Sequence, residues 1–291
     1  MKNKKVIIII SIIILVIIVG LAMLIFTRKF DKIADMNSLK DVDSDKKQID
    51  IYESYNYSKA PSSYNSGVPI FMYHYVRDDT GDYEYKENMV KVSTMEEHLK
   101  YIADNGYESI FMDDLESLYR FRKTVAINYD DGFICVYLYA FPLLKKYNVK
   151  ATIFVIKDMI GTPGYCTLEQ LHEMYDSGLV DIQIHTVTHP RLATLNYDNI
   201  KYEISECKNF IEKEFNKEAK ILCYPYGSYN NLVINVAKEL GCSYGLAMTG
   251  GMYYTTKTKN NYMIPRIYAY RTMPIEEYIS YLKKSYVNVV W

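Results

Sequence analysis

The distribution of apolar and polar residues divides the chain into three parts. Residues 6–26 form an apolar run without a charged side chain, and Lys2, Lys4 and Lys5 precede it. A helix of about 20 apolar residues spans the hydrocarbon core of a bilayer. The core of a secretory signal is shorter, and a cleavage site is only weakly indicated here. We therefore expect residues 1–27 to be an uncleaved membrane anchor.

The basic residues before the anchor favour a cytoplasmic N-terminus, which would place the rest of the chain outside the cell. Arg28, Lys29 and Lys32 on the far side weaken this bias. Residues 28–66 are polar and charged, and neither a helical nor a strand period persists in them. We expect a flexible extracellular linker between a single-pass anchor and a folded domain at 67–291.

Beyond residue 67, short apolar runs alternate with amphipathic stretches about seven times. Continuously apolar strands are typical of a parallel sheet that is covered on both faces, so the pattern predicts an α/β fold. The predicted strands are residues 68–73, 125–129, 151–156, 180–184, 221–224, 243–248 and 264–268. The predicted helices are residues 93–105, 113–121, 134–147, 167–177, 197–215 and 231–240, with a last helix that begins near Pro274.

Two short signals refine this prediction. Ser93 with Glu96, and Thr167 with Gln170, have the spacing of capping boxes and predict where two helices begin. The length suits either a (β/α) barrel or a doubly wound sheet. The barrel is favoured, because polar residues cluster at the ends of several strands rather than at one switch point.

Charge and cysteine content argue against several classes of function. The 34 basic and 35 acidic residues nearly cancel, so the chain lacks the basic signature of a nucleic-acid-binding protein. The five cysteines are odd in number and include no CxxC pair, which argues against a disulfide framework and a thiolate zinc site. We expect most of them to be small buried side chains.

Two adjacent carboxylates, Asp130 and Asp131, follow the strand predicted at 125–129, and Gly132 comes next. The carboxyl end of a buried parallel strand is where α/β proteins handle ligands. Neighbouring carboxylates repel each other unless a cation or a shared proton holds them. One interpretation is that one carboxylate binds a metal while the other moves a proton. The alternative is a polar turn, for which Asp-Gly is a common dipeptide.

His185 and His189 follow the strand predicted at 180–184 and favour the metal interpretation. They are two of the five histidines of the chain, and a tight turn must bring them together, because they follow a strand. Two imidazoles and one carboxylate leave open positions on a metal, as in catalytic rather than structural sites. Zinc fits this ligand set, and Co²⁺, Ni²⁺ or Fe²⁺ would accept the same ligands.

These motifs resemble those of carbohydrate esterase family 4, the polysaccharide deacetylases with NodB homology. The matching segments are Tyr129-Asp130-Asp131-Gly132 for the first family motif, His185-Thr186-Val187-Thr188-His189 for the second and Tyr224-Pro225-Tyr226-Gly227, in part, for the third. The resemblance covers roughly residues 68–291. It implies a distorted (β/α) barrel of NodB type.

The resemblance also implies Asp131, His185 and His189 as metal ligands and Asp130 as the catalytic base. In that mechanism, the metal lowers the pKa of bound water towards about 7 and polarises the acetyl carbonyl. Asp130 takes the proton of the water as it attacks. The backbone N–H of Tyr226 would stabilise the oxyanion. A general acid must then protonate the departing sugar nitrogen, because an amine leaves badly without that proton.

Two features depart from the family pattern. The usual arginine of the third motif, which pairs with the catalytic aspartate, falls at Cys223. Arg266, on a neighbouring predicted strand, is a candidate to replace it, and an ordinary surface arginine is the alternative. No histidine follows His189, so the usual late Leu-x-His motif is absent. His74, at the end of the first predicted strand, is then the candidate general acid. The alternatives are that His74 hydrogen-bonds to a metal ligand or that it only packs.

The chain is thus predicted to be a membrane-tethered, metal-dependent N-deacetylase that acts outside the cell on a polymer of N-acetylglucosamine. The polymer would be peptidoglycan or poly-N-acetylglucosamine. Met72-Tyr73-His74 and the missing third-motif arginine loosely resemble the poly-N-acetylglucosamine branch and some Gram-positive wall deacetylases. Two other functions stay open. One is a xylan-type O-acetyl esterase, because an alkoxide leaves with less help than an amine, and the other is a catalytically inactive glycan-binding domain.

Overall fold

The structure, a computed structural model, covers one folded domain. The described residues belong to a compact unit that takes in Ser63–Trp291, and they are 67–77, 88–115, 123–254 and 260–285. The predicted anchor at 1–27 and linker at 28–66 lie outside them, as does most of the helix predicted at 113–121. No helix within the described ranges combines the length and the apolar character needed to cross a bilayer.

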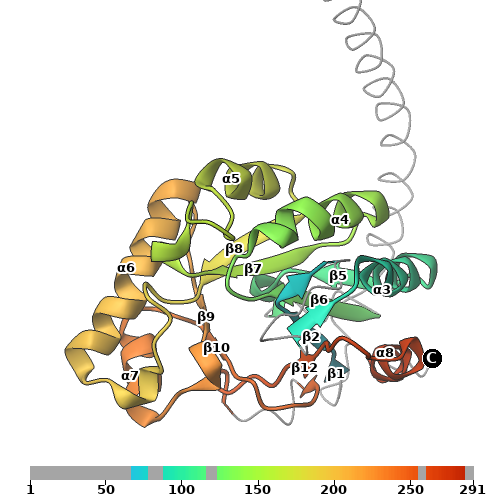
Figure 1. Ribbon diagram of the computed structural model, residues 1–291. Coiled ribbons are helices and arrows are strands. Elements are labelled where there is room, and N and C mark those ends of the chain that lie inside the picture. The colour runs from blue at the N-terminus through green and yellow to red at the C-terminus, as the bar shows by residue number, and fades with distance from the viewer. Residues whose placement is uncertain (1–66, 78–87, 116–122, 255–259, 286–291) are drawn as a thin grey trace, which may run out of the picture. The chain divides into compact units, whose positions relative to one another are not determined.

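A parallel sheet of eight strands forms the centre of the domain (Figure 1). The strands lie in the spatial order β10-β9-β8-β7-β6-β2-β12, and β5 also pairs with β6. Their bounds are β2 Ile70–Tyr73, β5 Glu108–Ile110, β6 Thr124–Tyr129, β7 Ala151–Val155, β8 Val180–Ile184, β9 Ile221–Cys223, β10 Tyr244–Leu246 and β12 Ile267–Tyr268. The smaller pairings are β1 (Gly67–Val68) with β11 (Tyr253–Tyr254), antiparallel, and β3 (Tyr75–Val76) with β4 (Met89–Val90), parallel.

The central sheet curls until its two edges share one stretch of chain. Just before β12, the backbone N–H of Ala247 donates to Ile264, and the N–H of Ile264 donates to Gly245, each at 2.9 Å. Just after β12, the N–H of Ala269 donates to Met72 of β2 at 3.0 Å. The same stretch therefore bonds to β10 on one side and to β2 on the other. The predicted parallel α/β fold is confirmed as a curled sheet.

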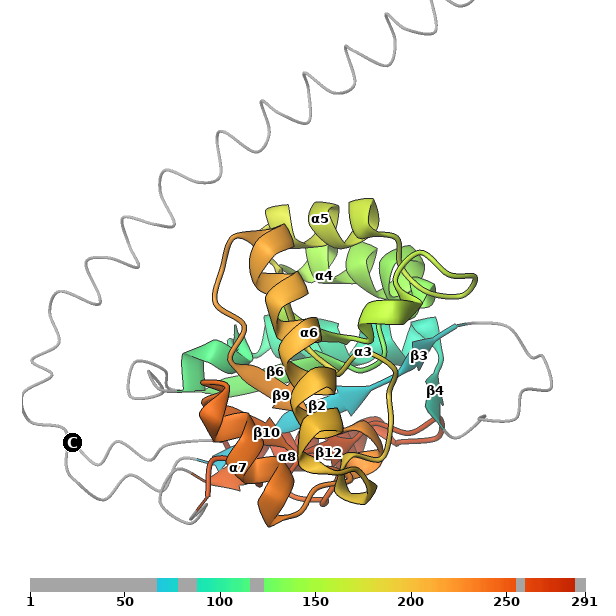
Figure 2. The ribbon, with the colours of Figure 1, turned by 90° about the vertical axis from the view of Figure 1, so that its left-hand side faces the viewer.

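Helices lie around the outside of the sheet, as the two views in Figures 1 and 2 show. They are α3 Val92–Asp104, α4 Phe141–Tyr147, α5 Leu168–Asp176, α6 Tyr197–Phe215, α7 Asn231–Glu239 and α8 Ile275–Lys283. The longest, α6, runs across the sheet in Figure 2. Its buried positions recur every three or four residues, as expected for an amphipathic helix on a core, and they include one carboxylate, Glu203.

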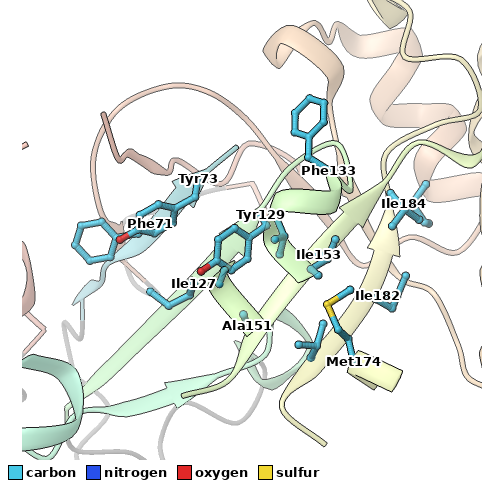
Figure 3. Packing of buried hydrophobic residues seen from close by; sticks show 14 of the residues in the cluster. Phe71, Tyr73, Ile127, Tyr129, Phe133, Ala151, Ile153, Met174, Ile182 and Ile184 are labelled. Atoms are coloured by element: carbon cyan, nitrogen blue, oxygen red, sulfur yellow. The ribbon is translucent and has the colours of Figure 1, made fainter. Parts of the chain in front are cut away.

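The strands are buried on both faces, and each face belongs to a different core. Ile127 and Tyr129 of β6 face the helices, and Figure 3 shows them near Ile153. Ala126, which directly precedes Ile127, belongs to a smaller apolar cluster on the inner face of the curl, together with Phe154 of β7. This two-sided burial explains why the strands appear in the sequence as continuous apolar runs.

The predicted helix starts are partly right. Thr167 forms the predicted capping box with Gln170 at the start of α5. The box predicted at Ser93 is wrong, because α3 begins one residue earlier at Val92 and has no side-chain cap. Glu96 pairs instead with Lys146 of α4 at 2.5 Å.

The helix predicted at 134–147 is divided into two forms. A π-helical turn, Val136–Ala140, comes first, and α4 follows with Pro142 in its first turn. Proline lacks the N–H that would bond to the preceding turn, and a wider turn before it avoids the steric conflict. Four strands of two or three residues, β3, β4, β5 and β11, were not predicted.

A buried histidine links α3 to the sheet and to α8. His98 is fully buried, its Nδ1 lies 2.9 Å from the hydroxyl of Tyr73, and its ring stacks on Tyr278 at 3.9 Å. Its Nε2 has no hydrogen-bond partner. Burial lowers the pKa of His98 from 6.5 to about 3. The folded protein therefore holds this imidazole in its neutral form.

We expect His98 to make the protein sensitive to acid. Below pH 6.5 the unfolded chain binds a proton that the folded protein does not accept until about pH 3, so stability falls as the pH falls through this window. Between pH 7 and pH 4.5 the loss should be about 2–3 kcal/mol. His98→Phe keeps a ring to stack on Tyr278 but has no group that takes up a proton. The stability that this variant loses over the same pH range should therefore be smaller by that amount, as measured by urea titrations of the purified full chain. Equal losses in both proteins would contradict this expectation.

Candidate active site

Four strand ends bring the predicted site residues to one edge of the sheet. Asp130 and Asp131 follow β6, and His74 follows β2. His185 follows β8, and Tyr226 lies three residues after β9. These strands are parallel, so their carboxyl ends meet at the same edge. This is the edge at which α/β barrels carry their chemistry.

Asp131, His185 and His189 converge on one point. Oδ1 of Asp131 lies 3.3 Å from Nε2 of His185 and 3.3 Å from Nε2 of His189. The other ring nitrogen of His185, Nδ1, lies 2.9 Å from the backbone carbonyl of Cys223. A carbonyl can only accept a hydrogen bond, so Nδ1 carries the proton and Nε2 is the nitrogen offered to a ligand.

These three side chains fit a divalent cation. Oδ1 of Asp131 is buried and has no hydrogen-bond partner, although both imidazoles face it. Ligands at 2.0–2.1 Å from a tetrahedral zinc ion are separated from one another by about 3.3 Å. The two distances from Oδ1 of Asp131 match this spacing, and all three donor atoms lie within 4.8 Å of one another. An ion would also supply the missing partner of the Asp131 oxygen.

The protonation states of the three groups are consistent with this fit. Burial raises the pKa of Asp131, but contacts with His185 and His189 outweigh burial and leave this pKa below its usual value. Burial and the neighbouring His185 lower the pKa of His189 to about 4. Burial lowers the pKa of His185, yet Cys223 and Asp131 raise it above its usual value. A proton and a cation thus compete for His185, because metal ligands must be deprotonated.

Asp130 is held by Arg266 and not by the histidines that face Asp131. The guanidinium of Arg266 donates to both carboxylate oxygens of Asp130, at 2.7 and 2.8 Å, and its Nε donates to the carbonyl of Ala247 at 3.1 Å. Both residues are almost fully buried, at 2% and 1% exposure. Burial raises the pKa of Asp130, but Arg266 more than reverses this and keeps the pKa far below its usual value. Asp130 is therefore ionised.

Cys223 lies beside this ion pair. Its Sγ is 3.1 Å from Arg266 and 3.5 Å from Asp130. Arg266 thus makes the contact expected of the third-motif arginine, although it reaches Asp130 from the stretch before β12. The alternative of a surface arginine is wrong.

His74 and Tyr226 complete the group. Nε2 of His74 lies 4.0 Å from Asp130, and its Nδ1 is buried without a hydrogen-bond partner. The ring of Tyr226 lies 4.6 Å from that of His189, is half exposed, and has the guanidinium of Arg191 over it at 4.4 Å. All seven predicted side chains are accordingly brought to one site.

The backbone around the site is held in an unusual conformation. Four of its residues have positive φ, namely Asp131 (71°), Thr186 (71°), His189 (61°) and Tyr226 (57°). Glycines aside, the other described residues with positive φ are Asn148 and Asn216, which end helices. Left-handed conformations are costly for most residues and persist only where surrounding contacts hold them. Among the described residues, the non-glycine left-handed conformations that do not end a helix mark the site.

One residue of the site was missed from the sequence. Glu203 of α6 accepts hydrogen bonds from the turn between His185 and His189. A signal was available, because the period of the predicted helix at 197–215 places this glutamate on the apolar face, next to Ile204. A carboxylate on a buried face requires a specific partner.

The family model described as polysaccharide deacetylase matches residues 120–245. Over 203 residues the chain is 30% identical to a poly-β-1,6-N-acetyl-D-glucosamine N-deacetylase of Staphylococcus aureus (strain MRSA252). This match covers 63% of the chain and 69% of the relative. It is 31% identical over 191 residues to YxkH of Bacillus subtilis (strain 168), covering 63% of this chain and 65% of YxkH, just under two thirds of its length.

A solved structure shows the same fold. The chain matches a Streptococcus pyogenes deacetylase, PplD, in complex with acetate, with a TM-score of 0.70 and 26% identity. The match covers 75% of this chain and 99% of that one.

The Asp130–Arg266 pair predicts a specific pattern of stabilities. Arg266→Met should lower the unfolding free energy by about 3–5 kcal/mol, because it leaves a buried carboxylate without a cation. Adding Asp130→Asn removes the stranded charge, so the double variant should be more stable than Arg266→Met alone. Urea unfolding of the wild type, both single variants and the double variant measures this. Losses that simply add would show that the two side chains are not coupled.

Proposed function

Because the chain belongs to the polysaccharide deacetylase family of hydrolases, we propose that it removes acetyl groups from N-acetylglucosamine residues of a polysaccharide. The observation that carries this proposal is the convergence of Asp131, His185 and His189 beside an ionised Asp130. Two of the similar proteins support the substrate class. One relative is a poly-β-1,6-N-acetyl-D-glucosamine N-deacetylase, and a similar solved deacetylase holds acetate, the product of such a reaction.

Asp131, His185 and His189 would hold the cation, for which zinc is the proposed identity and Co²⁺, Ni²⁺ or Fe²⁺ are alternatives. Such a cation supplies a polarised carbonyl and a more acidic water. Asp130 accepts the proton of the attacking water. Arg266 keeps Asp130 ionised and oriented. It also makes Asp130 a weaker base, because it lowers the pKa of this carboxyl, which then binds a proton only briefly.

Tyr226 and His74 act at the two ends of the amide bond. The backbone N–H of Tyr226 stabilises the negative charge that develops on the carbonyl oxygen. His74 protonates the nitrogen of the departing sugar amine. Its place beside Asp130 supports this role, and so does the absence of any histidine after His189 in the sequence.

The setting of the enzyme is also part of the proposal. The apolar run within residues 1–27 supports a single-pass anchor, with residues 28–66 as a linker and the domain outside the cell. The bonds around β12 to both sheet edges support describing the fold as a distorted (β/α) barrel. The polymer would be peptidoglycan or poly-N-acetylglucosamine.

O-acetylated sugars are the second candidate substrate. The missing late histidine favours them, because an alkoxide leaves with less help from an acid than an amine does. A glycan-binding domain without catalysis is less well supported, since Asp130 and the three cation ligands are present and brought together.

We expect the purified full-length protein, kept in mild detergent, to release acetate from poly-N-acetylglucosamine or peptidoglycan and to lose this activity to a chelator. Asp130→Asn should lower turnover by about 10²–10⁴-fold while it still binds Co²⁺, because the base is not a ligand. His189→Ala should lose Co²⁺ binding as well. Acetate assays and the visible spectrum of bound Co²⁺ measure both effects. Loaded wild-type protein that releases no acetate from either polymer would refute the proposal.

His74→Gln separates an acid from a packing residue. If His74 protonates the amine, turnover of an N-acetyl oligosaccharide should fall about 10²–10⁴-fold. Turnover of an O-acetylated xylan oligomer should fall much less, roughly tenfold or under, because an alkoxide needs less help from the acid. Equal losses on the two substrates would mean that His74 only packs against the site.

A further inference from the structure

Glu203 is a buried carboxylate that the proposed chemistry does not use. It lies on the inner face of α6, next to Ile204, and is 7% exposed. Among the described residues, no lysine, arginine or histidine forms an ion pair with it. A buried charge is costly unless hydrogen bonds compensate it, so the partners of Glu203 indicate its role.

Those partners all belong to the turn that joins the two histidines. Oε2 of Glu203 accepts hydrogen bonds from the backbone N–H groups of Val187 and Thr188, both at 2.9 Å. Oε1 accepts from the hydroxyl of Thr188 at 2.6 Å. One carboxylate thus occupies three donors in two consecutive residues.

The turn needs such a restraint. Thr186 and His189 both have positive φ, and threonine is β-branched, so this conformation is costly for it. The N–H of His189 bonds to the hydroxyl of Thr186 at 3.0 Å, and the carbonyl of Thr186 accepts from Lys157 at 3.1 Å. Strained turns persist only where their surroundings hold them. Glu203 binds the N–H groups of Val187 and Thr188, which these contacts leave without a partner.

We propose that Glu203 is a positioning residue that sets the geometry of His185 and His189. Its hydrogen bonds go to the backbone and the hydroxyl between the two rings, so it acts through the turn that carries them. The inference deepens the proposed function, because it concerns the same cation site. It predicts that cation affinity depends on a carboxylate carried by α6, an element that contributes no ligand.

Three variants isolate this role. Glu203→Ala removes all three acceptors. Glu203→Gln keeps an oxygen for the two N–H groups and an amide that donates to Thr188. Thr188→Val removes one hydroxyl from the other side with little change of shape. Glu206→Ala, an exposed glutamate on the same helix, is the matched control.

The first measurement is a Co²⁺ titration of the full-length proteins. Glu203→Ala should bind Co²⁺ about 10–100-fold more weakly than the wild type, as for other residues that orient metal ligands. Glu203→Gln and Glu206→Ala should stay within roughly threefold of the wild type, and Thr188→Val should lie between. Wild-type affinity in both Glu203→Ala and Thr188→Val would overturn the inference.

The second measurement needs no metal. Hydrogen exchange at the amides of Val187 and Thr188 should be at least about tenfold faster in Glu203→Ala, while the amides of β7 and β8 stay protected. Unchanged exchange at these two amides would overturn the inference. If Glu203→Ala does not fold, wild-type Co²⁺ affinity in Thr188→Val would overturn it instead. Wild-type protein that binds Co²⁺ without releasing acetate would refute the proposed function alone. The Co²⁺ affinities and amide exchange rates of the Glu203 variants would still test the positioning role.

Discussion

Asp130 and Arg266 form an ion pair inside the protein, and both the fold and the site depend on it. The two residues are 136 positions apart, and neither is more than 2% exposed. Burying either charge alone would cost several kcal/mol. Arg266 lies on the stretch that joins β10 to β2, so the sheet must curl completely before Asp130 gains its partner. The closed sheet therefore brings together the two charges of the site.

The pair also resolves the repulsion between adjacent carboxylates. Asp130 is neutralised by Arg266, and Asp131 is left to the two histidines and the cation that they fit. The left-handed backbone at Asp131 lets neighbouring side chains serve different partners. Each carboxylate has its own positive charge, and neither needs a shared proton. In the proposed function, this separation would leave one aspartate to bind a cation and the other to accept protons.

Sequence periodicity predicted the elements that are long enough to show a period. Val180–Ile184 and Tyr197–Phe215 have the predicted bounds, because a continuous apolar run and an amphipathic repeat define them. Strands such as β5, with three residues, carry no period and were missed. The strand ends predicted which residues would gather. How His185 and His189 meet could not be predicted, because the turn between them is held by tertiary contacts with Glu203.

The position of the arginine shows what the site requires. The family pattern places it at the position of Cys223, whereas here the guanidinium arrives from the neighbouring edge and the small thiol lies 3.1 Å from it. A second arginine at 223 would put two cations against one carboxylate and fill the space that Arg266 occupies. The site therefore requires a positive charge beside Asp130, and the residue that carries it can come from a different part of the sequence. Arg266 satisfies this demand only because the sheet curls far enough to bring β12 beside β2.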